Sequence, residues 1–161
     1  MEPFRKIVIS DTSCLIALEH IGLPDLLSRL FEQIITTPEV AMEFGETLPK
    51  GIVIRPVVNK KLQDELENIL DSGESSAIAL AIETPDSYLL IDESLGRRVA
   101  KSRGLDLTGT VGVLLRAKEN HVITAIRPYI EQLELTGFRM SESLIIDVLK
   151  EAGEPWEWPQ E

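Results

Sequence analysis

Five acidic residues of this chain are candidates for a site that does chemistry: Asp11, Glu43, Glu74, Asp92 and Glu93. Asp11 and Asp92 each end a short apolar run, and Glu74 precedes an alanine-rich run. Carboxylates that come close together repel one another by kilocalories, so a cluster of them needs a cation. Oxygen ligands suit Mg²⁺ or Mn²⁺, and such a centre activates water and supports in-line displacement at a phosphodiester. These acids therefore predict a metal-dependent hydrolytic site.

The same acids also have ordinary structural interpretations. Asp11 and the two hydroxyl residues after it, Thr12 and Ser13, are typical helix caps. Glu74 would be stabilised at the first turn of a helix by the helix dipole, and Glu43 could be a solvated surface residue. Capping does not readily explain two apolar runs that each end in an acid and continue into a helix.

The elements that must position these acids alternate along the chain. Short apolar runs suited to buried strands are separated by segments with helical spacing, which favours a parallel sheet with right-handed crossovers. The carboxyl ends of such strands form the ligand crevice of open α/β sheets. The expected strands are residues 6–9, 33–37, 52–58, 88–91 and 105–110. The expected helices are residues 12–20, 23–31, 39–46, 60–70, 77–82, 95–103 and 111–120.

Beyond residue 123 the pattern contains helices only. Two amphipathic segments are followed by a tail in which Trp156 and Trp158 stand between prolines, where they could pack back on the domain or dock on a neighbour. We expect one domain over residues 1–153, with its core at about 5–125 and a helical part at 126–153. Residues 154–161 form the aromatic and proline-rich tail.

Composition sets broad limits on the class of protein. A length of 161 residues with 43% hydrophobic content suits one domain with a real core. A net charge of −11 disfavours indiscriminate binding to nucleic acid or anionic membranes, although a local basic patch could still meet a phosphate backbone. The single cysteine, Cys14, excludes an internal disulfide and is expected to be a small buried hydrophobe. Without a membrane-length apolar run, the chain is expected to be soluble and cytoplasmic.

Five segments, in order and with matching spacing, resemble PIN-domain proteins. These proteins include the toxins of VapC-type toxin–antitoxin pairs and a further subgroup of prokaryotic PIN proteins. The resemblance covers about residues 5–125. The segments are IVISDTS at 7–13, TPEVAME at 37–43, GESSAI at 73–78, LIDE with GR at 90–97, and TGTVG at 108–112.

The resemblance implies a three-layer α/β/α fold with a parallel five-stranded sheet and C-terminal helices. It further implies a Mg²⁺- or Mn²⁺-dependent endoribonuclease that acts on single-stranded RNA, forms a homodimer and is held in check by a small antitoxin protein. The implied catalytic acids and metal ligands are Asp11, Glu43, Glu74 and Asp92, with Glu93 as a further ligand. The implied supporting residues are Thr12, Ser13, Arg97 and Thr110.

Three positions leave the details of the implied site open. Glu74 stands where many family members have Asp, so its longer side chain could alter ligation. Asp92 and Glu93 are adjacent, and the sequence does not decide which of them faces the crevice. Arg97 could contact a phosphate, but we expect it to pair with an acid.

Two other functions compete with the nuclease. One is a PIN-fold interaction module with weak or no catalysis, whose acidity keeps it off RNA. The other is a phosphatase with Asp11 as its nucleophile. That chemistry usually needs a second acid two residues further on, where this chain has Ser13.

Overall fold

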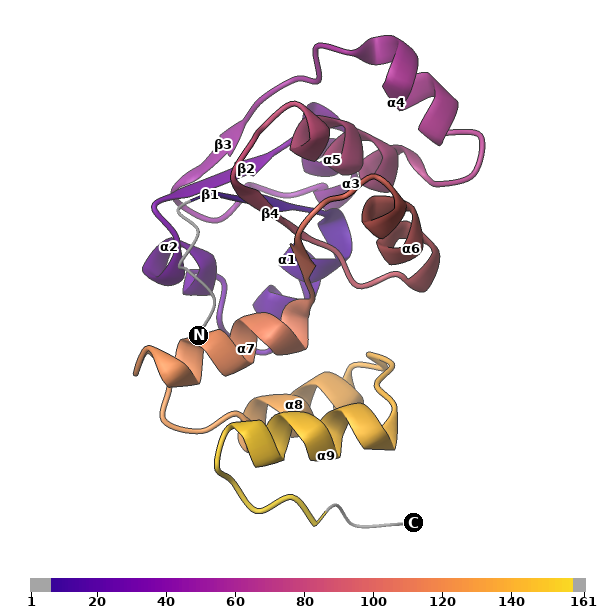
Figure 1. The fold of residues 1–161 in the computed structure, drawn as a ribbon. Helices are drawn as coiled ribbons and strands as arrows, with labels where there is room; N and C mark the ends of the chain where they lie inside the picture. The colour runs from indigo at the N-terminus through magenta and orange to yellow at the C-terminus, as the bar shows by residue number, and fades with distance from the viewer. Residues whose placement is uncertain (1–6, 158–161) are drawn as a thin grey trace.

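A computed structural model describes residues 7–157, in which five parallel strands form one central sheet (Figure 1). The strand order is β3-β2-β1-β4-β5. Since all the strands are parallel, their carboxyl ends lie along one edge of the sheet. The strands are β1 (Ile7–Ser10), β2 (Gln33–Thr36), β3 (Ile52–Ile54), β4 (Ser87–Leu90) and β5 (Leu107–Thr108).

The central strands are buried on both faces, and their alternating side chains supply two separate cores. Val8 of β1 faces one core, and the next residue, Ile9, faces the other. Neighbouring strands repeat the alternation, with Ile34 and Leu90 on the side of Val8. Burial on both faces explains why these strands read as continuous apolar runs in the sequence.

Helices cover both faces, which gives the three-layer α/β/α fold that the sequence predicts (Figure 1). The core on the Val8 side includes residues of α1 (Thr12–His20), α2 (Leu26–Leu30), α3 (Pro38–Phe44) and α7 (Thr110–Glu119). The core on the Ile9 side includes residues of α4 (Lys60–Leu66), α5 (Ser72–Ile82) and α6 (Ser94–Ser102). None of the helices within residues 7–157 has the length and apolar character needed to cross a bilayer.

The C-terminal helices α8 (Arg127–Leu135) and α9 (Glu142–Glu151) extend the Val8-side core through contacts with α1 and α7 (Figure 1). Glu154, which follows α9, links the start of α8 to α7. Its carboxylate accepts hydrogen bonds from the backbone N–H of Ile126 at 2.8 Å and of Arg127 at 3.2 Å. It also forms an ion pair with Lys118 of α7 at 2.9 Å.

The tail begins by folding back on the domain. The ring centre of Trp156 lies 4.2 Å from Nζ of Lys150 on α9, in a cation–π contact. Trp158 and the rest of the tail lie outside the described residues, as do residues 1–6 with the expected start of the first strand.

The structure corrects the expected ends of several elements. The third strand was expected to continue to residue 58, but β3 ends at Ile54. Arg55 still donates its N–H to the Thr36 carbonyl at 2.8 Å, whereas Pro56 has no N–H to donate. The fifth strand is only two residues long, and α4 ends at Leu66 instead of residue 70.

Candidate active site

Asp11 lies at the carboxyl end of β1, at the edge of the sheet where ligands bind in open α/β folds. It occupies the N-cap position of α1, but its side chain makes no capping hydrogen bond. The residue is only 4% exposed. Burial raises the pKa of Asp11 to about 7, even though a hydrogen bond from the backbone of Thr12 acts to lower it. Three nearby acids also raise this pKa: Asp71, Glu43 and Asp92.

Glu43 reaches the same place from the last turn of α3. Thr37 caps that helix by accepting a hydrogen bond from the N–H of Val40 at 3.1 Å. The carboxylate of Glu43 accepts hydrogen bonds from the Thr12 hydroxyl at 2.7 Å and from the N–H of Gly73 at 2.9 Å. These two donors fix the direction of a side chain on an otherwise exposed residue.

Glu74 lies in the first turn of α5 and is 8% exposed. Its Oε2 atom is buried and has no hydrogen-bond partner. Burial raises the pKa of Glu74 to about 8, and a hydrogen bond with Asp71 raises it as well. The negative charges of Asp71, Asp11 and Glu93 act in the same direction. Glu74 is thus a buried acid that is largely neutral at pH 7, because burial and the neighbouring negative charges disfavour its ionised form.

Asp71 belongs to this group although it was not among the acids singled out from the sequence. It caps α5 by accepting a hydrogen bond from the N–H of Glu74 at 2.8 Å. The signal that could have revealed it is the spacing Asp-x-x-Glu before an apolar run, which is typical of a helix N-terminus.

A cavity of about 270 Å³ lies among these side chains. Five acids line it: Asp11, Glu43, Asp71, Glu74 and Glu93. Thr12, Ser13 and Ile16 of α1 complete the lining. We call this space the acidic cavity.

Asp92 does not line the acidic cavity, and Glu93 does. The Oδ1 atom of Asp92 accepts a hydrogen bond from the N–H of Thr110 at 2.9 Å. Its Oδ2 atom accepts from the hydroxyl of Thr110 at 2.6 Å and from the thiol of Cys14 at 2.9 Å. These donors hold the carboxylate toward α7 and α1, where it lines a neighbouring cavity. Cys14 is buried as expected, but its contact with Asp92 was not foreseen.

Three glycines each lie directly against one of the acids. A Cβ atom on Gly96 would stand 2.6 Å from Glu74 Oε2, and one on Gly109 would stand 2.6 Å from Asp92 Oδ1. A Cβ atom on Gly73 would collide with the carboxylate of Glu43. Any larger residue at these positions would displace an acid, so glycine is part of the geometry of the site.

Arg97 does not form the expected pair with an acid. Its Nη1 atom donates to the backbone carbonyl of Ile91 at 2.8 Å, and it joins no ion pair in the part of the chain that the structure describes. The guanidinium group lines the cavity next to Asp92.

Asp11, Glu43, Glu74 and Asp92 were expected to converge on one metal ion, but their side chains do not form such a group. Across residues 7–157, no three His, Cys, Asp or Glu side chains are grouped so as to hold a metal ion. The reason is local, because protein donors hold Glu43 and Asp92 in their present directions. The chemistry of the acidic cavity nevertheless fits a cation, since Glu74 Oε2 is buried without a partner, and burial, together with the negative charges of nearby acids, raises the pKa of Asp11.

A family model described as a PIN domain matches residues 7–154, which include every element of the sheet and all of the helices described above. No curated protein shows significant similarity to the chain.

Proposed function

Because the chain belongs to the PIN-domain family, whose members are generally nucleases, we propose that it is a metal-dependent endoribonuclease with the acidic cavity as its active site. The observation that supports this most is the buried, unpartnered Oε2 atom of Glu74 beside the raised pKa of Asp11. Burying carboxylates without compensation is costly, and a divalent cation removes that cost.

We assign the metal to Asp11, Glu43 and Glu74, with Glu93 at the rim. Mg²⁺ and Mn²⁺ favour such oxygen ligands. Asp92 does not line the acidic cavity, but its negative charge raises the pKa of Asp11. When bound, the metal ion supplies an activated water and offsets the charge that develops at the phosphate.

The side chains in and next to the acidic cavity have separate roles. Asp11 has a pKa of about 7 and can hold or release a proton on its carboxylate at neutral pH. Thr12 fixes the carboxylate of Glu43 through its hydroxyl. The exposed Ser13 lines the cavity one residue further along α1, where its hydroxyl can donate to a phosphate oxygen. Thr110 orients Asp92 through its N–H and its hydroxyl.

Cleavage of a mixed pool of single-stranded RNA in Mn²⁺ tests this proposal. We expect cleavage by the wild-type protein and its loss in EDTA. Asp11→Asn and Glu74→Gln should each reduce the rate by more than about a hundredfold, since even partners outside the ligand shell can be worth 10- to 100-fold. Asp25→Asn and Glu46→Gln are matched controls, because both acids are exposed and lie outside the cavity. Folded wild-type protein that cleaves no RNA would contradict the proposal.

One observation favours an alternative, a PIN-fold interaction module with weak catalysis: the acids do not form a ready metal-binding group within residues 7–157. The same assay separates the two functions. Binding of RNA or protein without metal-dependent cleavage would support the interaction module.

The biological setting is a further part of the proposal. We propose a homodimer that serves as the toxin of a toxin–antitoxin pair, with a small antitoxin protein as its partner. Light scattering during gel filtration measures the oligomeric state. Growth arrest on expression, relieved by a small protein encoded beside it, would support the toxin role. Unaffected growth with active enzyme would contradict it.

A further inference from the structure

A second cavity, of about 360 Å³, lies beside the acidic cavity. One wall comes from β5 and the start of α7, and the other from the loop between α8 and α9 with Phe138 and Arg139. The two cavities lie on either side of the junction that follows β4, because Glu93 lines the acidic cavity and Asp92 lines this one. We call it the side cavity.

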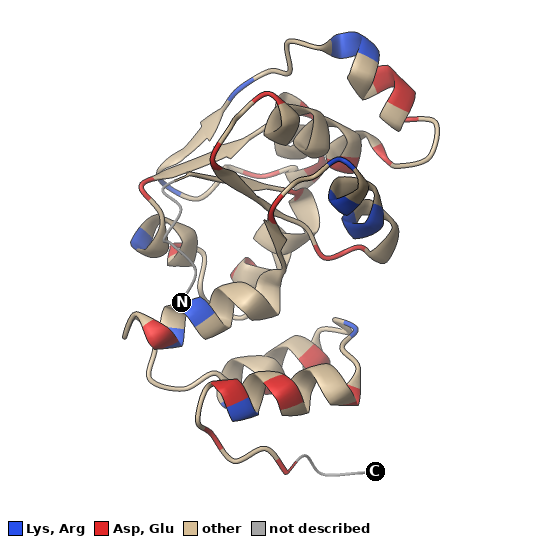
Figure 2. Cartoon of the chain, in the orientation of Figure 1, with Lys and Arg blue, Asp and Glu red and all other residues tan. Residues whose placement is uncertain are grey.

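Cations gather at the side cavity even though the chain has a net charge of −11. Arg97 of α6 and Arg139 of the α8–α9 loop both line it. Beyond Arg97, the same helix and its end carry Arg98, Lys101 and Arg103, with no acid from residue 94 to 104. Figure 2 shows the Lys and Arg positions of α6 in blue, with Asp and Glu positions in red on neighbouring segments.

These cations have no acidic partner among the described residues. Arg98, Lys101, Arg103 and Arg139 join no ion pair between residues 7 and 157. Arg97 has one nitrogen held by the Ile91 carbonyl, which fixes the guanidinium group at the cavity wall. Unpaired positive charge beside a predicted active site is suited to a phosphate-bearing ligand.

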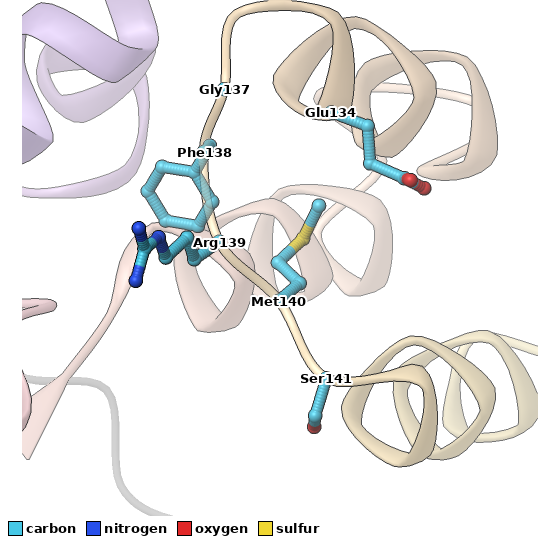
Figure 3. Close-up of a pocket in the computed structure, with 6 residues that line it drawn as sticks. All are labelled: Glu134, Gly137, Phe138, Arg139, Met140 and Ser141. Carbon is cyan, nitrogen blue, oxygen red and sulfur yellow. The ribbon is translucent and has the colours of Figure 1, made fainter.

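Phe138 adds an aromatic surface at the same place. Phe138 and Arg139 also line a larger cavity of about 600 Å³ along the α8–α9 loop, so the two cavities meet at these side chains. Figure 3 shows both side chains on one side of the loop, whereas Met140 and Glu134 lie on the other side. The ring is half-buried, so part of it faces the cavities.

We propose that the side cavity binds a nucleotide of single-stranded RNA next to the phosphodiester that is cleaved. Phe138 stacks on the base, while Arg139 and Arg97 bind phosphate oxygens. This inference rests on the proposed function, because the acidic cavity supplies the reason for RNA to pass there. A single-strand site needs an aromatic platform together with cations along the backbone, and the side cavity offers both.

The test is fluorescence anisotropy with a labelled 12-nucleotide single-stranded RNA in EDTA. The parent protein carries Asp11→Asn so that the RNA stays intact. Phe138→Leu keeps an apolar residue in the half-buried position but removes the ring, and it should weaken binding at least about fivefold. Phe138→Tyr keeps the ring and should bind like the parent.

Arg139→Ala addresses the charge independently, because Arg139 is exposed and its loss does not disturb a core. It should weaken binding and reduce the slope of log K against log salt by about 0.7, the loss of one phosphate contact to a single strand. Arg29→Ala on α2 is the matched control, with an exposed arginine far from the side cavity in sequence and outside its lining. It should change neither the affinity nor the slope.

Equal RNA binding by the parent, Phe138→Leu and Arg139→Ala would overturn the inference. The inference would also be overturned if a poly-glutamate peptide displaced the labelled RNA as well as unlabelled RNA does, because the surface would then suit acidic proteins equally well. The result is separable from the proposed function. If the wild-type protein cleaves RNA but the variants bind RNA as the parent does, only the proposed role of the side cavity is refuted. If the variants bind RNA more weakly but the wild-type protein cleaves none, only the proposed nuclease activity is refuted.

Discussion

The carboxyl group of Asp11 is present in both its neutral and its charged form near pH 7, because burial raises its pKa to about 7. In the unfolded chain the same group ionises near its ordinary value of 3.8. The folded protein therefore binds more protons than the unfolded chain between these two values. Stability from this group is fully present below pH 4 and is lost as the pH rises through 7.

Asp11→Asn should consequently stabilise the metal-free protein at pH 8. The gain in the free energy of unfolding is at most about 4 kcal/mol, since one pKa unit corresponds to about 1.4 kcal/mol. At pH 4 the variant and the wild type should differ much less. Thermal melts of both proteins in EDTA at the two pH values measure the effect, and a variant that melts lower than wild type at pH 8 would contradict it.

Gly96 limits the position of Glu74 sterically. A Cβ atom there would stand 2.6 Å from both Glu74 Oε2 and the Cδ1 atom of Ile91. Gly96→Ala should lower the free energy of unfolding by about 1–3 kcal/mol, the usual cost of overpacking, and should weaken Mn²⁺ binding.

Adding Glu74→Asp to Gly96→Ala separates the contact of the new methyl group with Glu74 from its contact with Ile91. The shorter acid makes room for the methyl group, so the double variant should recover part of the lost stability. Urea unfolding and Mn²⁺ titration calorimetry give the two readouts. A Gly96→Ala protein with wild-type stability and affinity would show that glycine is not needed at this position.

At the scale of elements, Glu154 ties α8 to α7. Burial acts to raise the pKa of Glu154, but hydrogen bonds from Lys118 and from the N–H groups of Ile126 and Arg127 lower it below its ordinary value. The stability from this group is therefore present at neutral pH and is lost as the pH falls through the folded pKa.

Glu154→Ala should lower the free energy of unfolding at pH 7 by about 1–2 kcal/mol, by analogy with the loss of a helix cap. The gap between variant and wild type should narrow as the pH falls through the lowered pKa of Glu154, because protonation removes the charge. Urea midpoints over a descending pH series measure this. Glu151→Ala is the control, because Glu151 is exposed at the end of α9, and a gap that stays equally large down to the lowest pH would contradict the role of the charge.

The elements were largely predictable from sequence because the alternation of apolar runs and helical spacing fixes a parallel sheet. Their ends were less predictable. The two-residue strand β5 depends on pairing of Leu89 with Leu107 and of Leu90 with Thr108, which no local pattern reveals. Four of the five acids that line the acidic cavity were singled out from the sequence, and Asp71 was missed. That Glu93 faces the acidic cavity instead of Asp92 depends on donors from Thr110 and Cys14, which are distant in sequence.

At the scale of the whole molecule, an acidic protein carries its predicted active site beside one basic helix (Figure 2). For the RNA substrate proposed above, the net charge of −11 means repulsion at long range, so the approach of RNA depends on local cations. The basic side of α6 is the surface that can provide them.

Arg98→Glu combined with Lys101→Glu should therefore raise KM for RNA several-fold and leave kcat nearly unchanged, because both residues lie outside the acidic cavity. Lys50→Glu combined with Lys61→Glu is the control, with the same change of net charge at exposed positions elsewhere. Steady-state cleavage at low salt compares them. Equal effects of the two pairs would assign the change to net charge alone.

The central claim is that the acidic cavity holds a divalent cation, and anomalous diffraction from a crystal soaked in Mn²⁺ tests it most directly. We expect a peak within about 2.0–2.3 Å of carboxylate oxygens of Asp11 and Glu74. Glu43 or Glu93 should turn to complete the coordination. The absence of a peak there at saturating Mn²⁺, or a peak bound only by acids outside this cavity, would contradict the claim.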